Sequence, residues 1–189
     1  MLSSHKMLGP TGIGALVATE ELLAAMPPVL TGGSMITRVE LQDADYMPAP
    51  IKFEAGTQRV SQAVAFAEAV RYLQHLGMDN VHAWEQELGA RLVAGVQNIE
   101  GVRLLGPTDP NKRAGLVSLG IDGVHPHDAG QLLDTKGIAV RVGHHCAQPL
   151  HRGAGLTAST RASAYLYNTT EDIDAFLAAL AEVRPYFGF

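Results

Sequence analysis

Apolar residues recur at helical spacing along two neighbouring segments of the chain. The first segment begins beyond Thr57 and stops at Gly77, a residue type common at helix C-termini. Its apolar stripe consists of Val60, Val64, Phe66, Ala67, Val70, Leu73 and Leu76. The second segment runs from about Val81 to Ile99 and carries Trp84, Leu88, Leu92, Val93 and Val96. The spacing predicts two consecutive helices, the second of which leads into a new domain.

The segment before these helices is more irregular. The run from Gly9 to Val17 mixes apolar β-formers with glycine and predicts a strand. The sequence TEELLAAM that follows predicts a short helix, with Thr19 as its N-cap and acidic residues in its first turn. Pro27 and Pro28 end this helix, and the stretch from Thr31 to Pro50 predicts an extended, irregular crossing segment.

Short apolar runs dominate the chain beyond Gly101, where we place a domain boundary. Predicted strands are VRLLGP, AGLVSLGI, IAVRVG and STRASAYLY, and predicted helices are HDAGQLLDTKG and DIDAFLAALAEVRPYF. The resulting β-β-α-β-β-α order favours a small α/β layer, with a mostly antiparallel sheet covered on one side by helices. A doubly wound nucleotide-binding fold is disfavoured.

Composition narrows the class of protein. The chain has 189 residues, of which 47% are hydrophobic and 17% are charged, and these values are typical of a folded globular protein. Its net charge of −5 comes without a Lys/Arg cluster, which argues against a nucleic-acid partner. No segment is long and apolar enough to span a bilayer, so we expect a cytoplasmic chain. Motifs of the GxGxxG, Walker A, CxxC and HExxH types do not occur.

The single cysteine, Cys146, lies in the sequence RVGHHCAQPL. A thiol that attacks an electrophilic sulfur needs thiolate character, which a nearby imidazolium or guanidinium can favour. Arg141, His144 and His145 are candidates for that cation. A Cys–His metal site is a competing interpretation, but the consecutive His144, His145 and Cys146 lack the usual ligand spacing, and we assign no metal ligand. An inert cysteine remains an alternative.

Lys6 stands in the sequence SSHKMLGPTGIG, just before the first predicted strand. A lysine bonds covalently to an aldehyde cofactor only as a neutral amine, so such a site must disfavour the ammonium form. Ser3 and His5 beside it are of the residue types that can hold a phosphate. The alternative is an exposed lysine near the N-terminus.

Two further motifs suggest anion binding. Gly56 and Thr57, in FEAGTQ, precede a predicted helix, where backbone N–H groups and a hydroxyl make a phosphate site or an ordinary N-cap. Arg161 interrupts the small and apolar run STRASAYLYNT. An arginine in such a place pairs either with an internal carboxylate or with the α-carboxylate of an amino-acid ligand.

In this order and at these separations, the segments resemble the cysteine desulfurases and selenocysteine lyases. These belong to the class V aminotransferase-like enzymes, and the similarity is greatest to the desulfurase of the Suf iron–sulfur assembly system. The resemblance covers essentially the whole chain through SHK, GPTGIG, GGSMI, FEAGT, RVGHHCAQP and TRASAYLYNT. RVGHHCAQP is highly specific, whereas SHK is weak without it.

The resemblance implies a role for each motif. Lys6 would bind pyridoxal 5′-phosphate covalently and move protons, with Ser3 and His5 at its phosphate. Cys146 would take the sulfur of L-cysteine as a persulfide and leave L-alanine. Arg161 would bind the substrate carboxylate, with Arg141 close to the active-site loop.

The resemblance also implies partners. In family homodimers, the loop that matches Gly56 and Thr57 reaches the phosphate of the partner subunit's cofactor. His127, in VHPHD, resembles a histidine that some Suf-type desulfurases offer to a sulfur-acceptor protein, although a surface histidine at a helix start explains it equally well.

The chain departs from the family pattern because family members carry a long portion ahead of the lysine. That portion supplies the residue stacked on the cofactor ring, the aspartate at the pyridine nitrogen and most of the phosphate cup. Ser4 and Gln58 stand where Gly and Pro are commoner.

We therefore expect the C-terminal part of a pyridoxal-phosphate-dependent transferase fold. Its parts are a remnant of the large domain at 1–75, a linking helix at 76–100 and a complete small domain at 101–189. The isolated chain is expected to be inactive. The alternatives are a non-catalytic sulfur-relay module and a selenocysteine lyase.

Overall fold

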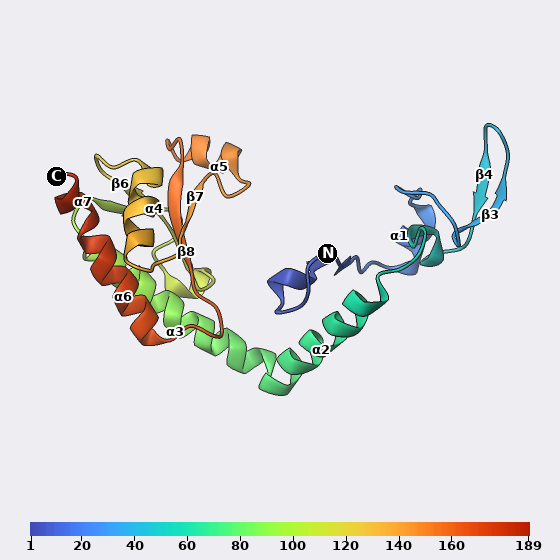
Figure 1. Ribbon diagram of the computed structural model, residues 1–189, viewed down its shortest axis with the longest axis horizontal. Helices are drawn as coiled ribbons and strands as arrows, with labels where there is room; N and C mark the ends of the chain where they lie inside the picture. Colours follow the sequence, from blue (N-terminus) through green and yellow to red (C-terminus); the bar gives the residue numbers. More distant parts are fainter. The chain divides into compact units, whose positions relative to one another are not determined.

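The computed structural model describes all residues, 1–189, which divide into two compact units, 1–76 and 77–189 (Figure 1). The sequence pattern places a linking helix at 76–100. In the structure, helix α3, Met78–Gln97, belongs to the second unit and buries its apolar side chains in that unit's core. Our assignment of the two parts to a large and a small domain of a longer enzyme stays a prediction.

The first unit is built from short elements and one long helix. Strands β1, Leu2–Ser3, and β2, Gly14–Ala15, pair antiparallel around a short 3₁₀ helix, Ser4–Lys6. Helix α1, Glu20–Ala25, leads to the hairpin of β3, Ile36–Val39, and β4, Ala44–Tyr46. A second 3₁₀ helix, Ile51–Phe53, precedes α2, Val60–Leu76.

Local sequence signals explain most of these elements. The Thr19 hydroxyl accepts a hydrogen bond from the Leu22 N–H, as expected for the N-cap of α1. Helix α2 ends before Gly77, whose φ of 83° lies in the left-handed region that glycine adopts without strain. The strand predicted at Gly9–Val17 is present only as β2, because the chain turns through Gly12 at a φ of 84°.

The second unit contains a four-stranded sheet in the order β5-β6-β8-β7, with every neighbouring pair antiparallel. The strands are β5, Val102–Leu104; β6, Leu116–Ile121; β7, Arg141–Gly143; and β8, Ser159–Ser163. The helices after α3 are α4, Pro126–Thr135; α5, Gln148–Gly153; α6, Thr170–Ala181; and α7, Val183–Tyr186, with a 3₁₀ helix at Pro110–Lys112. The α/β prediction with an antiparallel sheet is confirmed.

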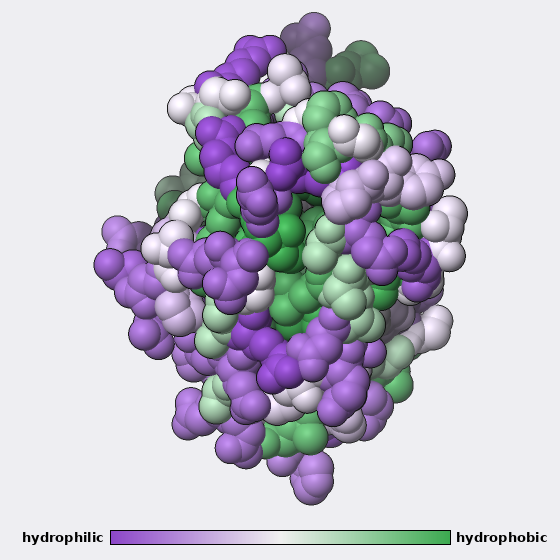
Figure 2. All heavy atoms as spheres, turned by 90° about the vertical axis from the view of Figure 1, so that its left-hand side faces the viewer, coloured by the Kyte–Doolittle hydropathy of each residue, from purple (hydrophilic) through white to green (hydrophobic).

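The hydrophobic core lies on one face of this sheet, against helices α3, α4 and α6. Alternate residues of β6, Val117, Leu119 and Ile121, are buried there. On the face shown in Figure 2, hydrophilic side chains surround a smaller hydrophobic area. No helix is both long and apolar enough to cross a membrane.

The opposite face of the sheet carries polar and charged positions. Ser118 of β6 lies directly opposite Arg161 of β8, and Arg161 lies opposite Arg141 of β7. Because directly paired residues of antiparallel strands share one face, these three side chains lie on the same side of the sheet. Ser159 joins them, since residues two apart on a strand face the same way.

Helix α6 begins with a reciprocal capping box. The Thr169 hydroxyl accepts from the Asp172 N–H, and the Asp172 carboxylate accepts from the Thr169 N–H. The hydrogen bond from the Thr169 N–H, followed by one from the Asn168 side chain, holds the pKa of the Asp172 carboxyl below its ordinary value. We expect Thr169→Ala to lower the free energy of unfolding by about 1 kcal/mol in urea denaturation. Thr157→Ala, at an exposed position of the same unit, is the control and should change it far less.

Candidate functional site

Cys146 occupies a tight turn immediately after β7. The Ala147 N–H donates to the His144 carbonyl at 2.8 Å, which closes a four-residue turn. The two central residues, His145 and Cys146, have φ values of 52° and 62°. Positive φ at both central positions is the pattern of a type I′ turn, which normally takes Asn or Gly. Two non-glycine residues are therefore held in a conformation that they rarely adopt, with the thiol exposed to solvent.

A guanidinium lies against the thiol. Arg141 donates from Nη2 to the Cys146 Sγ at 3.5 Å, and the two residues line one concavity with the His144–His145 turn. The contact places a positively charged hydrogen-bond donor directly beside the sulfur. The structure thus brings together two of the residues singled out in RVGHHCAQPL.

Arg161, which pairs with Arg141 in the sheet, also lacks a counter-ion. Arg161 lies opposite Arg141 in the sheet, and neither has an Asp or Glu within ion-pair distance. The Arg161 Nε is buried and has no hydrogen-bond partner. The internal salt bridge considered for Arg161 is therefore absent. Like charges placed directly opposite each other are unfavourable, so this face of the sheet is suited to bind an anion.

His145 has a half-buried imidazole in the same turn. Burial lowers its pKa below the ordinary 6.5, and the charges of Arg161, His151 and Arg141 act in the same direction. Only a contact with the Ser159 backbone opposes the change. The imidazole is therefore neutral near pH 7, and the cation beside the thiol is the guanidinium of Arg141 rather than His145.

The lowered pKa of His145 predicts a pH dependence of stability. As the pH falls below about 6.5, the unfolded chain takes up this proton before the folded chain does, so the free energy of unfolding decreases. The contribution of neutral His145 to the free energy of unfolding is fully present above the pKa of His145 in the unfolded chain. It is fully lost below the lower pKa of His145 in the folded chain. Urea denaturation across this range should show the decrease, and His145→Gln should flatten it. An NMR titration midpoint of His145 at or above the ordinary value would contradict the prediction.

Lys6 and its neighbours belong to the first unit. Lys6 and His5 are exposed, and Ser3 is half-buried, all within or directly before the first 3₁₀ helix. Ser4 is fully buried with its hydroxyl unpaired, and a Cβ added at Gly9 would lie 2.1 Å from that oxygen. The close packing of Gly9 on Ser4 fixes the turn that follows Lys6. The amine is accessible to a carbonyl compound from solvent.

Gly56 and Thr57 form a bend ahead of α2. Gly56 adopts a φ of 78°, and its N–H donates to the Gly33 carbonyl at 2.9 Å. The first residue of α2 is Val60, so Thr57 lies too far upstream to be the N-cap of that helix. Thr57 is exposed, and its hydroxyl is available to an external group.

His127 lies in the first turn of α4. Its N–H donates to the Nδ1 of His125, the N-cap residue, and the two rings stack with centroids 5.5 Å apart. His127 is exposed. Across the chain, no three His, Cys, Asp or Glu side chains gather into an arrangement that could hold a metal ion.

Comparison with known proteins identifies the family. The model of the class-V aminotransferase family matches residues 1–176. The chain belongs to the class-V aminotransferase family. It is 53% identical over 186 residues to a probable cysteine desulfurase 2 of Mycobacterium leprae, covering 98% of this chain and 44% of the relative. A probable cysteine desulfurase of Staphylococcus aureus is 46% identical over 187 residues, with 99% and 45% covered.

Solved structures of class-V aminotransferase relatives agree with this assignment. A cysteine desulfurase of Escherichia coli, solved as an S-sulfonic acid, matches with a TM-score of 0.89 at 35% identity, over 97% of this chain and 45% of that one. The apo cysteine desulfurase of Thermococcus onnurineus matches with a TM-score of 0.88 at 37% identity, over 96% and 45%. This class-V aminotransferase chain spans a little under half the length of the relatives it matches.

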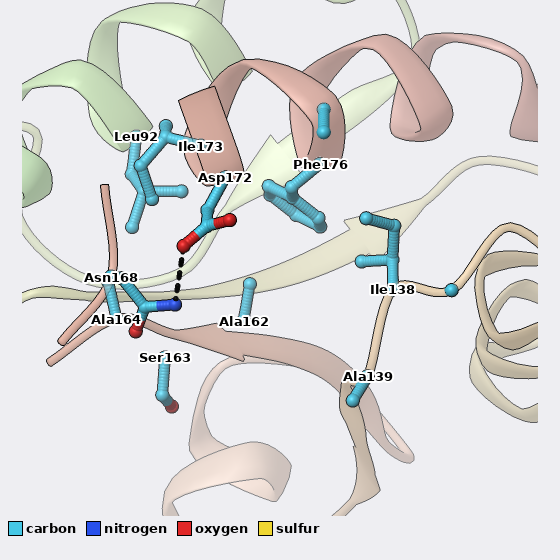
Figure 3. A pocket seen from close by; sticks show the side chains of 12 residues that line it. Leu92, Ile138, Ala139, Ala162, Ser163, Ala164, Asn168, Asp172, Ile173 and Phe176 are labelled. Carbon is cyan, nitrogen blue, oxygen red and sulfur yellow. Dashed lines mark hydrogen bonds between the residues drawn. The ribbon is translucent and has the colours of Figure 1, made fainter. Parts of the chain in front are cut away.

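A pocket elsewhere in the second unit has different chemistry (Figure 3). It is lined mainly by apolar side chains of α3, α6, β8 and the segment before β7, including Leu92, Ile138 and Phe176. The carboxylate in this pocket, Asp172, accepts a hydrogen bond from the Asn168 side chain at 3.1 Å and caps α6. Its hydrogen-bonding capacity is therefore already used within the protein. None of the site residues predicted for this class-V aminotransferase line the pocket.

The sequence pattern did not single out two residues near the thiol turn. Ser159 and His151 are fully or almost fully buried, and both contact the turn or the residues that hold it. Ser159 could have been found from strand periodicity, because it lies two residues before Arg161. His151 had no such signal, since the short helix α5 that carries it was not predicted.

Proposed function

We propose that this chain is the thiol-bearing part of a pyridoxal-phosphate-dependent cysteine desulfurase, which converts L-cysteine to L-alanine and retains the sulfur on Cys146. The observation that carries the proposal is the exposed Cys146 Sγ 3.5 Å from the Arg141 guanidinium, in a turn with positive φ at two consecutive residues. The similarity to probable cysteine desulfurases at 46–53% identity supports it.

The unpaired Arg161 suits the carboxylate of an amino-acid substrate. Its planar fork can donate two parallel hydrogen bonds to the two oxygens of a carboxylate, and no internal acid competes for it. Arg141 shares the same face of the sheet and remains beside the thiol. Binding an anion there would also relieve the repulsion between the two guanidinium groups.

The residues of the first unit fit one end of pyridoxal phosphate. Lys6 offers an accessible primary amine for the aldehyde, and Ser3 and His5 offer a hydroxyl and an imidazole for the phosphate. Gly56 and Thr57 offer a left-handed bend and an exposed hydroxyl for a phosphate, which we assign to the cofactor of a partner subunit. When bound, the cofactor supplies an electron sink for the carbon skeleton of the substrate.

The proposed sulfur transfer needs no external oxidant. The Cys146 thiolate forms a bond to the substrate sulfur while the substrate carbon–sulfur bond breaks. The electron pair of the broken bond stays with carbon, which takes a proton, and L-alanine results; we assign the delivery of that proton to Lys6. The sulfur remains on Cys146 as a persulfide, and a thiol acceptor then removes it.

The finer assignments are part of the same proposal. We assign the chain to a homodimer in the cytoplasm that supplies sulfur for iron–sulfur cluster assembly. His127 is the candidate contact for a Suf-type acceptor protein, since it is exposed at the start of α4.

Covalent labelling of Lys6 tests the proposal. The purified chain is mixed with pyridoxal phosphate, its visible absorption is recorded, and the adduct is reduced with borohydride and mapped by mass spectrometry. We expect the label on Lys6 and its loss in Lys6→Ala, with Lys112→Ala as a matched control at an exposed lysine. Label scattered over surface lysines would refute a cofactor site in this chain.

A sulfur-relay module is a second candidate. It is favoured by one observation: Cys146, Arg141 and Arg161 all lie in the second unit, whereas Lys6 lies in the first. A colourless chain that still takes up a persulfide on Cys146 would support it.

Alanine release from cysteine and from selenocysteine, with an N-terminal half supplied, distinguishes a desulfurase from a selenocysteine lyase.

A further inference from the structure

Three side chains beneath the thiol turn form a continuous hydrogen-bond chain. The Ser159 hydroxyl lies 2.9 Å from the Nε2 of His145 and 2.9 Å from the Nε2 of His151. The Nδ1 of His151 lies 3.0 Å from the Ala147 carbonyl. Ser159 is fully buried on β8, and His151 is 3% exposed on α5. These hydrogen bonds therefore join a strand and a helix to two residues of the turn that carries Cys146, its central residue His145 and its last residue Ala147.

The Ala147 carbonyl sets the direction of every bond in this chain. A carbonyl oxygen only accepts, so the His151 Nδ1 donates to it. A neutral His151 then has an unprotonated Nε2, which accepts from the Ser159 hydroxyl. With its single proton used in this way, the Ser159 oxygen accepts from the Nε2–H of His145. His145 is thereby held with its proton on Nε2.

This proton arrangement agrees with an independent feature of His145. Its Nδ1 is buried and has no hydrogen-bond partner. Buried N–H groups without an acceptor are rarer in proteins than buried acceptors without a donor, so an Nδ1 without a proton fits this position better. The unpaired atom is the one that the hydrogen-bond chain leaves without a proton.

The turn itself needs such support. Left-handed φ values at non-glycine residues persist only where the surroundings determine them, and here two follow each other, at His145 and Cys146. The Ala147 N–H closes the turn on one side, while the Ala147 carbonyl and the His145 ring tie it to α5 and β8. No other side-chain hydrogen bond holds His145.

We propose that Ser159 and His151 are positioning residues that fix the His145 ring as its Nε2–H form and thereby hold Cys146 against Arg141. The inference deepens the proposed function, since the thiol that it positions is the one assigned to sulfur transfer. Its test uses neither cofactor nor L-cysteine, so either proposal can fail without the other.

The first measurement is the ring ¹⁵N NMR spectrum of the full chain at about pH 8, where imidazoles with ordinary pKa values are neutral. We expect His145 to show the proton on Nε2. A proton on Nδ1 would overturn the proposal whatever the variants do.

The second measurement is the rate at which iodoacetamide alkylates Cys146 at the same pH. In Ser159→Ala the rate should fall about five- to tenfold, the size expected for loss of one hydrogen bond, and the His145 spectrum should become a mixture of both forms. Ser159→Thr keeps the hydroxyl and should restore both readouts. Ser163→Ala, an exposed position on the same strand, is the matched control. An unchanged rate and spectrum in folded Ser159→Ala would overturn the proposal.

Discussion

Replacement of Cys146 by serine is expected to abolish persulfide formation on this chain. A serine hydroxyl is not ionised at neutral pH and cannot hold sulfur as a persulfide, so the loss should reach about three orders of magnitude or more. The measurement is a mass spectrum of the peptide containing residue 146, after incubation with L-cysteine, pyridoxal phosphate and the N-terminal part of a matching desulfurase. The chain that retains Cys146 should gain the mass of one sulfur atom, and a thiol should remove that sulfur.

A graded variant separates the role of the thiol from that of its cation. Arg141→Gln keeps Cys146 but removes the guanidinium 3.5 Å from its sulfur, so persulfide should still form, only more slowly. Arg152→Gln is a control, because that exposed arginine of α5 has no ion pair. Release of alanine from L-cysteine at an unchanged rate by the Cys146→Ser chain would exclude Cys146 as the sulfur acceptor.

Periodicity predicted the helices of the chain because their signals are local. The stripe that ends at Gly77, the N-cap at Thr19 and the helix beginning near Asp172 all have their causes within a few residues. The short helix α5 was missed, because QPLHRG combines a proline and a glycine with no apolar stripe. The β3–β4 hairpin was missed for a related reason: its segment is rich in turn-forming residues and buries little side-chain surface.

Strand ends were predicted too long where a turn competes with pairing. The run STRASAYLY was expected to continue as a strand to Tyr167, but β8 ends at Ser163. The Asn168 side chain accepts from the Tyr165 N–H at 3.0 Å, and the Asn168 N–H donates to the Tyr165 carbonyl at 2.9 Å. These bonds close a loop that a hydrophobic pattern does not reveal.

The site shows the same division between local and non-local causes. Cys146 and Arg141 could be named together because they lie only five positions apart in the sequence. The pairing of Arg141 with Arg161 depends on the register of β7 against β8. The contact of His145 with Ser159 depends on how the segment between β7 and β8 folds back on the sheet. Neither contact is encoded in spacing along the chain, so the pairing of the two arginines and the hydrogen bonds beneath the thiol turn emerged only from the folded structure.

Replacement of Leu119 by alanine is expected to cost about 3–4 kcal/mol of the free energy of unfolding, the largest stability effect that we predict. Leu119 is fully buried at the centre of β6, where it faces the helices that cover the sheet. Its removal leaves a cavity among the surrounding core residues, which relax only in part. Urea denaturation followed by circular dichroism measures the change.

Leu150→Ala makes the same chemical change at a site that is 69% exposed in the same unit, and it should shift the free energy of unfolding by about 0.5 kcal/mol or less. The comparison tests where the stability of the second unit resides. Equal effects of the two substitutions would mean that β6 is not the centre of the core. A large effect confined to Leu119→Ala would mean that the helix-covered face of the sheet supplies most of the stability. If the rate of Cys146 alkylation is also unchanged below the unfolding transition, the opposite face, which carries the unpaired arginines and the thiol turn, does not depend on Leu119.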